Sequence, residues 1–383
     1  MENLIKMEFG EIAELRKEKF NPVNSNESKP CLELEHFEQA TGKIIGFISS
    51  LEQKSIKNVF YKGDVLFGKL RPYLRKYWLA EFDGVCSSEV WVLKPKTTDI
   101  SNSYLFNLIQ TNEFIQAANV SSGSKMPRAD WGYIINYPFS IINSKNEQTT
   151  IANLLSTWDN AITKTQALIA QKEQRKKWLM QNLLTGKMRL KGFEKTKWKK
   201  VGAGEIFESF TKKGFENEEL LSATQDRGII PRSQLEGRVT MPEGTTVGYK
   251  LVEPGDFIIS LRSFQGGLEY SYFRGIVSPA YIVLKPKEKI EVEFYKQYYK
   301  SYEFIGRLAT AVIGIRDGKQ VSYDDFCIVK IPFPSYEEQT AIAQVLQAAD
   351  KEIQLLKTKC TKLKEQKKGL MQVLLTGKKR LII

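Results

Sequence analysis

A run of basic and aromatic residues at 68–78, GKLRPYLRKYW, carries the side chains best suited to contact a nucleic acid. Lys and Arg can bind backbone phosphates, and Arg can also read the edge of guanine. The aromatic residues could equally be core residues beside an exposed cationic strand, and both interpretations stay open at this point. From this run the DNA-binding candidates are Lys69, Arg71 and Arg75.

Two polar loops that contain glycine carry further side chains able to contact bases. They read SSGSKMPRADW at 121–131 and IGIRDGKQVSYDD at 313–325, and a third, shorter loop reads TQDRG at 224–228. Ordinary exposed turns have a similar composition, which is the alternative interpretation. Arg262, which ends the run GDFIISLR at 255–262, is a further candidate for DNA binding. The DNA-binding candidates of these segments are Ser124, Lys125, Arg128, Arg227, Arg262, Arg316, Lys319 and Gln320.

No pattern in the chain predicts catalysis. The one histidine, His36, cannot form a duplicated acid–base or metal site, and the four cysteines are far apart without a CxxC pair, which also indicates a reducing cytoplasm. TGK at 185–187 lacks the glycine spacing of a P-loop. Neither a GxGxxG after a strand nor the Asn-Pro-Pro-aromatic tetrapeptide of amino-methyltransferases occurs. We therefore predict that this chain has no catalytic residues and binds no metal or cofactor.

One helical segment occurs twice in the chain, with nearly half of its positions identical. Residues 147–190 begin EQTTIANLLSTWDNAI and end KKWLMQNLLTGKMRL, and residues 338–381 begin EQTAIAQVLQAADKEI and end KKGLMQVLLTGKKRL. Shorter echoes precede each copy, namely GD…LR at 63–71 and 255–262 and VLKPK at 92–96 and 283–287. A repeat this long indicates a tandem duplication with internal pseudo-two-fold symmetry.

Each repeated segment is expected to form a long helix with an apolar seam in the a/d rhythm of a coiled coil. Gly186 and Gly377 suit the left-handed position after a helix end, and each EQ pair is expected in the first turn of a shorter preceding helix. Lys172 and Lys176 interrupt the first seam. The seam residues are Ile162, Ile169, Leu179, Leu183, Ile353, Leu356, Leu363, Leu370 and Leu374.

If the two seams pack on each other, the helices are antiparallel. About 25 residues at ~1.5 Å each would then hold the globular parts about 37 Å apart, which is close to one turn of B-DNA. The alternative is an intermolecular coiled coil that only dimerises the chain.

The sequence predicts an α+β fold of two mixed α/β domains joined by two long antiparallel coiled-coil helices. The expected segments are a first domain at 1–145, a helix at 146–190, a second domain at 191–336 and a helix at 337–383. Strands are expected at 65–70, 90–93, 257–261 and 280–284, because β-branched and aromatic residues lie there beside Gly and Pro. Helices are expected at 103–117 and 292–310.

The net charge of +13 points to an acidic partner, with nucleic acid as the first candidate. The repeated segments carry most of this charge, +4 and +6, although a solvated helix face would explain it equally well. No apolar run approaches the roughly 18 residues that a membrane span needs. The N-terminus lacks the apolar core of a signal peptide.

These features resemble the specificity (S) subunit of type I restriction–modification systems. The repeated helical segments with their LLTGK endings carry the resemblance, supported by the GD…LR and VLKPK elements, and it extends over essentially the whole chain. It implies that the globular parts are target recognition domains, each reading one half of a split, asymmetric DNA sequence, and that the helices set the spacer. It implies two modification subunits as partners, which supply adenine methylation dependent on S-adenosylmethionine, and restriction subunits can join them.

We therefore predict a non-catalytic subunit that binds double-stranded DNA sequence-specifically and directs a methyltransferase complex. One alternative is a helical assembly adaptor that does not contact DNA, which predicts no salt-dependent DNA affinity. The other is a self-sufficient DNA-modifying enzyme, which predicts methyl transfer or cleavage by the purified chain alone.

Overall fold

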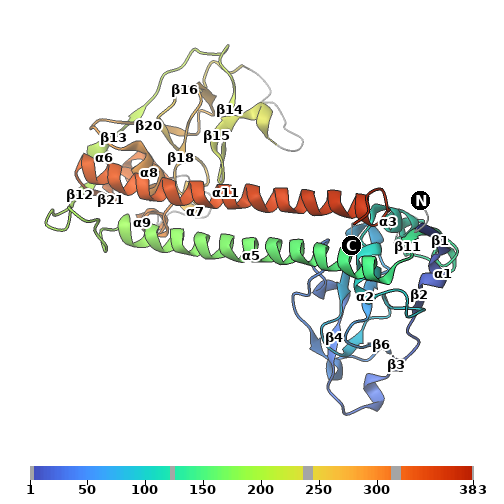
Figure 1. Cartoon of the computed structure of the whole chain (residues 1–383). Coiled ribbons are helices and arrows are strands. Elements are labelled where there is room, and N and C mark those ends of the chain that lie inside the picture. The colour runs from blue at the N-terminus through green and yellow to red at the C-terminus, as the bar shows by residue number, and fades with distance from the viewer. Residues whose placement is uncertain (1–3, 121–125, 236–244, 312–320, 382–383) are drawn as a thin grey trace. The chain divides into compact units, whose positions relative to one another are not determined.

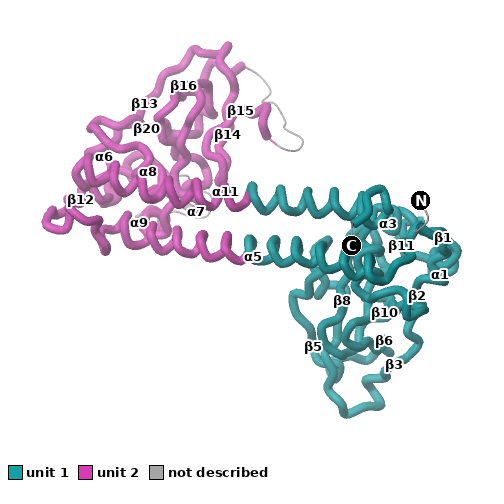
Figure 2. Tube along the Cα trace, viewed as in Figure 1, with its two compact units in different colours: residues 1–166, 358–383 teal, residues 167–357 magenta. Residues whose placement is uncertain are grey.

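A computed structural model describes residues 4–120, 126–235, 245–311 and 321–381, and these residues divide between two compact units. Unit 1 comprises residues 1–166 and 358–383, and unit 2 comprises residues 167–357 (Figure 2). Each unit therefore contains one globular part and a portion of each of two long helices, α5 (Lys145–Leu183) and α11 (Tyr336–Leu374). The two units are defined by contacts between residues, whereas the four predicted segments were defined by the sequence repeat. The division into units therefore does not test the predicted segment boundaries.

The globular part of unit 1 consists of three sheets and short helices (Figure 1). A two-stranded sheet pairs β1 (Leu4–Glu8) with β11 (Pro138–Ile142). The four-stranded sheet has the order β2 (Ala13–Leu15), β10 (Val90–Pro95), β7 (Val65–Gly68), β8 (Tyr77–Leu79). The five-stranded sheet has the order β3 (Lys19–Phe20), β6 (Lys57–Phe60), β9 (Gly84–Cys86), β4 (Pro30–Leu32), β5 (Ile48–Ser49). The α-helices are α1 (Phe9–Ile12), α2 (Asn102–Leu108), α3 (Asn112–Asn119) and α4 (Trp131–Ile134).

Unit 2 repeats the two-stranded and the four-stranded sheet of unit 1. A two-stranded sheet pairs β12 (Lys199–Gly202) with β21 (Lys330–Phe333), and the four-stranded sheet has the order β13 (Phe207–Phe210), β20 (Ile282–Pro286), β17 (Phe257–Ile259), β18 (Glu269–Tyr270). Two further pairs are β14 (Leu221–Thr224) with β15 (Gly228–Pro231), and β16 (Lys250–Val252) with β19 (Gly275–Val277). The helices are α6 (Ala203–Ile206), α7 (Ser263–Gly266), α8 (Val292–Tyr299), α9 (Tyr302–Ala311) and α10 (Tyr323–Ile328). The predicted α+β fold of two mixed domains is confirmed, and the four-stranded sheets share one strand order.

The short sequence echoes have the same structural role in both units. Each GD pair forms a turn in which the buried carboxylate of Asp64 or Asp256 accepts a backbone N–H of that turn at 2.8 Å. The last lysine of each VLKPK, Lys96 or Lys287, donates to a backbone carbonyl of the short helix α1 or α6, at 2.8 and 2.5 Å. The GD carboxylates therefore hold the turns before β7 and β17, and the lysines hold the ends of β10 and β20 to the neighbouring short helix.

The leucines before each TGK lie in the hydrophobic cores. Leu183 and Leu184, where α5 ends, belong to the core of unit 2, and Leu374 and Leu375, where α11 ends, belong to the core of unit 1. All four side chains are buried. The chain thus leaves the globular part of unit 1 through α5 and enters the core of unit 2, and α11 makes the reverse connection.

Two helix predictions were wrong. Each EQ pair lies in the first turns of one uninterrupted helix of 39 residues, because no Pro interrupts α5 or α11. The helices expected at 103–117 and 292–310 are each two helices. The side chains of Thr111 and Ser301 accept the backbone N–H three residues later, at 3.2 Å, and so begin α3 and α9 as new helices.

Gly186 and Gly377 adopt the left-handed conformation expected of them, with φ of 71° and 66°. The N–H of Gly186 donates to the Leu183 carbonyl at 3.3 Å, and that of Gly377 donates to the Leu374 carbonyl at 3.2 Å, which is the inner bond of a Schellman motif. A Cβ added at Gly377 would lie 2.5 Å from Leu4 of β1. The helix end is thus bound closely to the first strand of the unit.

Gly377→Ala should destabilise the full chain by about 1–2 kcal/mol, because an L-residue is strained in the left-handed conformation and its Cβ would displace Leu4. Gly369→Ala is the matched control, since that glycine lies inside α11 and a Cβ added there would meet open space. It should stabilise the chain by up to about 1 kcal/mol. Denaturant unfolding followed by circular dichroism measures both, and equal shifts of the midpoint would contradict the assigned strain.

Candidate nucleic-acid interface

Two of the predicted DNA-binding segments form one surface of unit 1. The segment after β7 and residues 126–129 are joined by backbone hydrogen bonds, from Arg71 N to the Pro127 oxygen and from Ala129 N to the Lys69 oxygen, both 2.8 Å long. A β-bridge between Leu70 and Arg128 lies between these bonds. The two runs, which are far apart in the sequence, therefore act as a single structural element.

The side chains of this surface divide into exposed and internally bonded groups. Arg71 and Arg128 are exposed, and Arg128 Nε lies 3.0 Å from Glu89 Oε2. Arg75 is bonded within the unit, because it donates to the Gln110 carbonyl at 3.1 Å and to Asn112 Oδ1 at 2.7 Å. Lys69 is half-buried. Base contact by any of them stays a prediction.

The aromatic residues of the same run have different environments. Tyr77 and Trp78 are core residues of β8, 4% and 3% exposed, as the structural interpretation of the run expects. Tyr73 is 51% exposed and lies in a one-turn helix between Arg71 and Arg75, both of which have a left-handed φ of 53°. Such a conformation is uncommon for residues other than glycine, so the fold holds this loop in a defined shape.

The candidates in unit 2 lie on two neighbouring elements. Arg262 is exposed immediately before α7, and Arg227 is exposed in the turn between β14 and β15. The ammonium of Lys300 joins the two elements, because it donates to the carbonyls of Gln225 and Gly266 at 3.3 and 3.0 Å. Arg227 and Arg262 thus belong to one surface.

Arg71 and Arg262 occupy corresponding places in the two units. Each follows the third strand of the four-stranded sheet, β7 or β17, and each precedes a short helix. The remaining candidates, Ser124, Lys125, Arg316, Lys319 and Gln320, lie outside the described residues.

The seam residues lie on the less exposed face of each long helix. Of the predicted set, Ile162, Leu183, Ile353 and Leu374 are buried, and Ile169, Leu179, Leu356, Leu363 and Leu370 are half-buried. Lys172 and Lys176, which interrupt the first seam, have acidic partners on α11 of unit 2. Their Nζ atoms lie 2.5 Å from Glu352 and 2.6 Å from Asp350.

Sequence reasoning missed two pairs of interactions that follow the internal repeat. In unit 1, Arg380 binds the buried carboxylate of Glu147 with two nitrogens, with Nε 2.6 Å from Oε1. In unit 2, the repeat-equivalent Arg189 binds the buried carboxylate of Glu338 in the same way, at 2.7 Å. Trp198 Nε1 donates to the same carboxylate at 2.8 Å.

The second interaction lies farther along the helices. Lys367 lies 2.7 Å from Asp159 in unit 1, and the equivalent Lys176 lies 2.6 Å from Asp350 in unit 2. Each of these ion pairs joins one copy of the repeat to the other and requires α5 and α11 to be antiparallel within each unit. The signal in the sequence was that all these charged positions are identical in the two copies, namely Glu147/Glu338, Asp159/Asp350, Lys176/Lys367 and Arg189/Arg380.

Two further properties concern the described part of the chain. In it, no group of three or more His, Cys, Asp or Glu side chains is arranged to hold a metal ion. Nor does that part contain a helix long and apolar enough to cross a membrane.

Glu147→Gln should lower the thermal midpoint of the chain at neutral pH, because the hydrogen bonds to Arg380 lower the pKa of the Glu147 carboxyl. A carboxyl whose pKa is lowered by folding stabilises the fold above its unfolded pKa, about 4.3, and this stability is lost as the pH falls through the folded pKa. The difference between the proteins should therefore close in strong acid. Glu365→Gln, at an exposed position of α11, is the control. A difference independent of pH would refute the assignment.

Comparison with known proteins places the chain in a family. The family described as type I restriction modification DNA specificity domain matches residues 1–173 and 195–365. Over 369 residues the chain is 26% identical to the putative type I restriction enzyme MjaX specificity subunit of Methanocaldococcus jannaschii, covering 88% of this chain and 83% of that protein.

Solved structures share the fold. The crystal structure of the HsdS subunit from Thermoanaerobacter tengcongensis has a TM-score of 0.56 at 20% identity, over 98% of this chain and 97% of that one. A chain from work on complex assembly and conformational transition of the type I R-M system has a TM-score of 0.65 at 18% identity, over 98% of both chains. With two family matches that together cover most of its length, this chain belongs to the type I restriction–modification DNA specificity family.

Proposed function

We propose that this chain reads a bipartite, asymmetric DNA sequence, one half with each unit, and directs methyltransferase subunits to it without catalysing a reaction itself. Its family membership makes it a DNA sequence-recognition subunit of a restriction–modification complex. The observation that supports a split target is the duplicated position of Arg71 and Arg262, each exposed after the third strand of an equivalent sheet. Around these positions the loops differ in sequence, as two different half-sites require.

The helices support the assembly part of the proposal. α5 and α11 are the most similar parts of the two copies, and their equivalent charged residues bind one another across the repeat. A duplicated helical surface offers two like sites, so we propose two modification subunits as partners, with S-adenosylmethionine bound by them and not by this chain. Restriction subunits could join this complex through the same partners.

The direct test is to assemble the chain with its modification subunit and to sequence the methylated adenines in DNA exposed to the complex. A split motif with a fixed spacer, absent without this chain, supports the proposal. Unpatterned methylation by an assembled complex would favour an adaptor, and methyl transfer or cleavage by this chain alone would show that it is an enzyme.

Arg71→Ala and Arg262→Ala should each relax the methylated motif in one half only, and in different halves. An Arg that contacts a base edge contributes about 1–3 kcal/mol of discrimination, so the affected position should accept other bases roughly ten-fold more readily. Lys62→Ala, at an exposed lysine of unit 1, is the control for loss of charge. Relaxation of both halves by one substitution would contradict independent reading.

One heptad added to each long helix should lengthen the spacer between the half-sites by about three base pairs. Seven residues add ~10 Å to a helix and keep the phase of a seam that repeats every seven residues. Insertion after Gln166 in α5 and before Thr358 in α11 leaves the ion pairs Asp159–Lys367 and Lys176–Asp350 intact. The methylated motif reports the spacer, and an unchanged spacer would show that the helices do not set it.

A further inference from the structure

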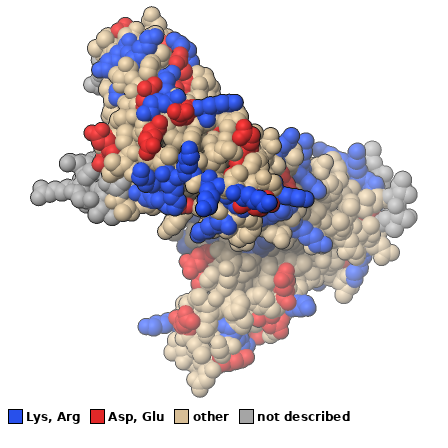
Figure 3. Space-filling view, turned by 90° about the vertical axis from the view of Figure 1, so that its left-hand side faces the viewer, with Lys and Arg blue, Asp and Glu red and all other residues tan. Residues whose placement is uncertain are grey.

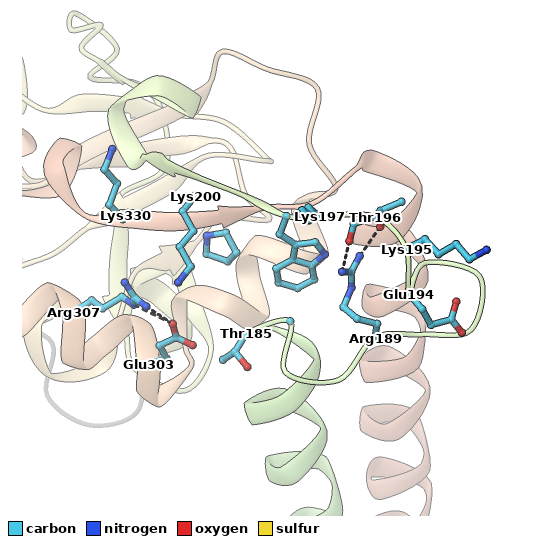
Figure 4. A pocket seen from close by; sticks show the side chains of 13 residues that line it. Thr185, Arg189, Glu194, Lys195, Thr196, Lys197, Lys200, Glu303, Arg307 and Lys330 are labelled. Carbon is cyan, nitrogen blue, oxygen red and sulfur yellow. Dashed lines mark hydrogen bonds and ion pairs between the residues drawn. The ribbon is translucent and has the colours of Figure 1, made fainter.

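A hollow of about 460 Å³ lies within unit 2, beside the end of α5. The segment that follows α5, the sheet formed by β12 and β21, and α9 line it (Figure 4). Its cationic residues, here called the basic pocket, are Arg189, Lys195, Lys197, Lys200, Arg307 and Lys330. Figure 3 shows Lys and Arg side chains gathered on the part of unit 2 that faces the viewer, with acidic side chains among and above them.

The carboxylates of this hollow do not balance its cations. Glu303 is bonded to Arg307, with distances of 2.7 and 3.0 Å from its Oε1 to two guanidinium nitrogens. Arg189 is neutralised by the buried Glu338, and Lys330 has a long ion pair of 3.9 Å with the exposed Glu205. Among the described residues, Lys197 and Lys200 have no ion-pair partner, so the pocket keeps an excess of positive charge.

The sheet brings two of these cations onto one face. Lys200 pairs with Pro332 across β12 and β21, and Gly202 pairs with Lys330, so Lys200 and Lys330 are diagonal neighbours. Side chains in this arrangement lie ~7–8 Å apart at their bases, which is within reach of one ligand bound by two long side chains. Figure 4 shows Lys200 directed toward the Arg307–Glu303 pair rather than into open solvent. An anion beside Lys200 and Arg307 would offset the positive charge there, whereas the ammonium of Lys330 is directed away from these two residues in Figure 4.

The corresponding place in unit 1 lacks this charge. In unit 1, β1 ends at Glu8 directly before α1, just as β12 ends at Gly202 directly before α6. Lys6 therefore corresponds to Lys200. The strand partner of Glu8, Pro138, corresponds to Lys330, the partner of Gly202. Counted from the helix-starting residues Thr111 and Ser301, Ala117 occupies the place of Arg307. At these three positions unit 1 thus has one cation, Lys6, where unit 2 has Lys200, Lys330 and Arg307.

We propose that the basic pocket binds a phosphate group and so gives unit 2 an anion site that unit 1 lacks. Arginine guanidinium and lysine ammonium groups commonly bind phosphate in proteins. A phosphate dianion offsets two positive charges, whereas a monoanion such as chloride offsets one. The hollow is of the size of small-molecule sites. The phosphate can belong to the backbone of bound DNA or to a free phosphate compound.

The first arm of the test measures the thermal midpoint of the full chain in millimolar sodium phosphate against sodium chloride of equal ionic strength. Low concentration matters, because concentrated phosphate stabilises proteins by exclusion from their surface. Phosphate should raise the midpoint of the wild type and of the matched control Lys6→Ala. The double variant Lys200→Ala/Lys330→Ala should lose this increase, and both of its substituted residues are exposed, so its fold is expected to persist.

The second arm identifies the source of the phosphate through the salt dependence of duplex binding by the assembled complex. If the phosphate belongs to DNA, the slope of log affinity against log salt should fall by about 0.9 in the double variant, with the methylated motif unchanged. If the double variant loses the phosphate-induced increase in thermal midpoint but keeps the wild-type salt slope, the site binds a free phosphate compound. The proposal is overturned if the double variant keeps both the shift and the slope. The first arm needs no DNA, so it remains informative even if the proposed DNA-binding function fails.

Discussion

The structure depends on an exchange of helix ends between its two units. The leucine pair that ends α5 is buried in the core of unit 2, and the pair that ends α11 is buried in the core of unit 1. Full burial of a leucine contributes about 1.5–3 kcal/mol, more than a partly exposed ion pair does. The apolar insertion therefore fixes each helix end, and the neighbouring Arg189–Glu338 and Glu147–Arg380 pairs set its orientation. Neither core is complete without a helix that starts in the other unit.

This exchange explains which parts of the duplicated sequence stayed alike. A residue on the long helices contacts side chains of its own copy of the repeat and of the other copy. A change at Glu147 would therefore need a compensating change at Arg380, to which it is bonded. The GD and VLKPK elements are constrained in a similar way, because they hold turns and helix ends inside each unit. The surfaces around Arg71 and Arg262, in contrast, differ in sequence between the two copies. A constant scaffold with two divergent surfaces is what reading two unlike half-sites requires.

The units also differ in ways that the repeat alone would not indicate. Unit 1 adds a five-stranded sheet, whereas the described residues of unit 2 form two separate two-stranded pairs in the remaining part. Unit 2 has the basic pocket at a place where unit 1 has Ala117 and Pro138. The positive charge is therefore arranged differently in the two units, although their net charges are similar.

The sequence by itself determined the duplication, the fold class, the two central strands of each four-stranded sheet and the left-handed glycines, because these follow from local patterns and backbone geometry. The sequence wrongly predicted one helix in place of α2 and α3, and one in place of α8 and α9. The apolar periodicity continues across Thr111 and Ser301, and their capping hydrogen bonds cannot be seen in the sequence. Only the tertiary structure decided which charges meet. Glu147 and Arg380 are 233 residues apart in the sequence, and Lys69 and Ala129 belong to different segments. Such pairings depend on chain paths in space, which no local pattern encodes, and they show that the candidate surface of unit 1 is one element rather than two.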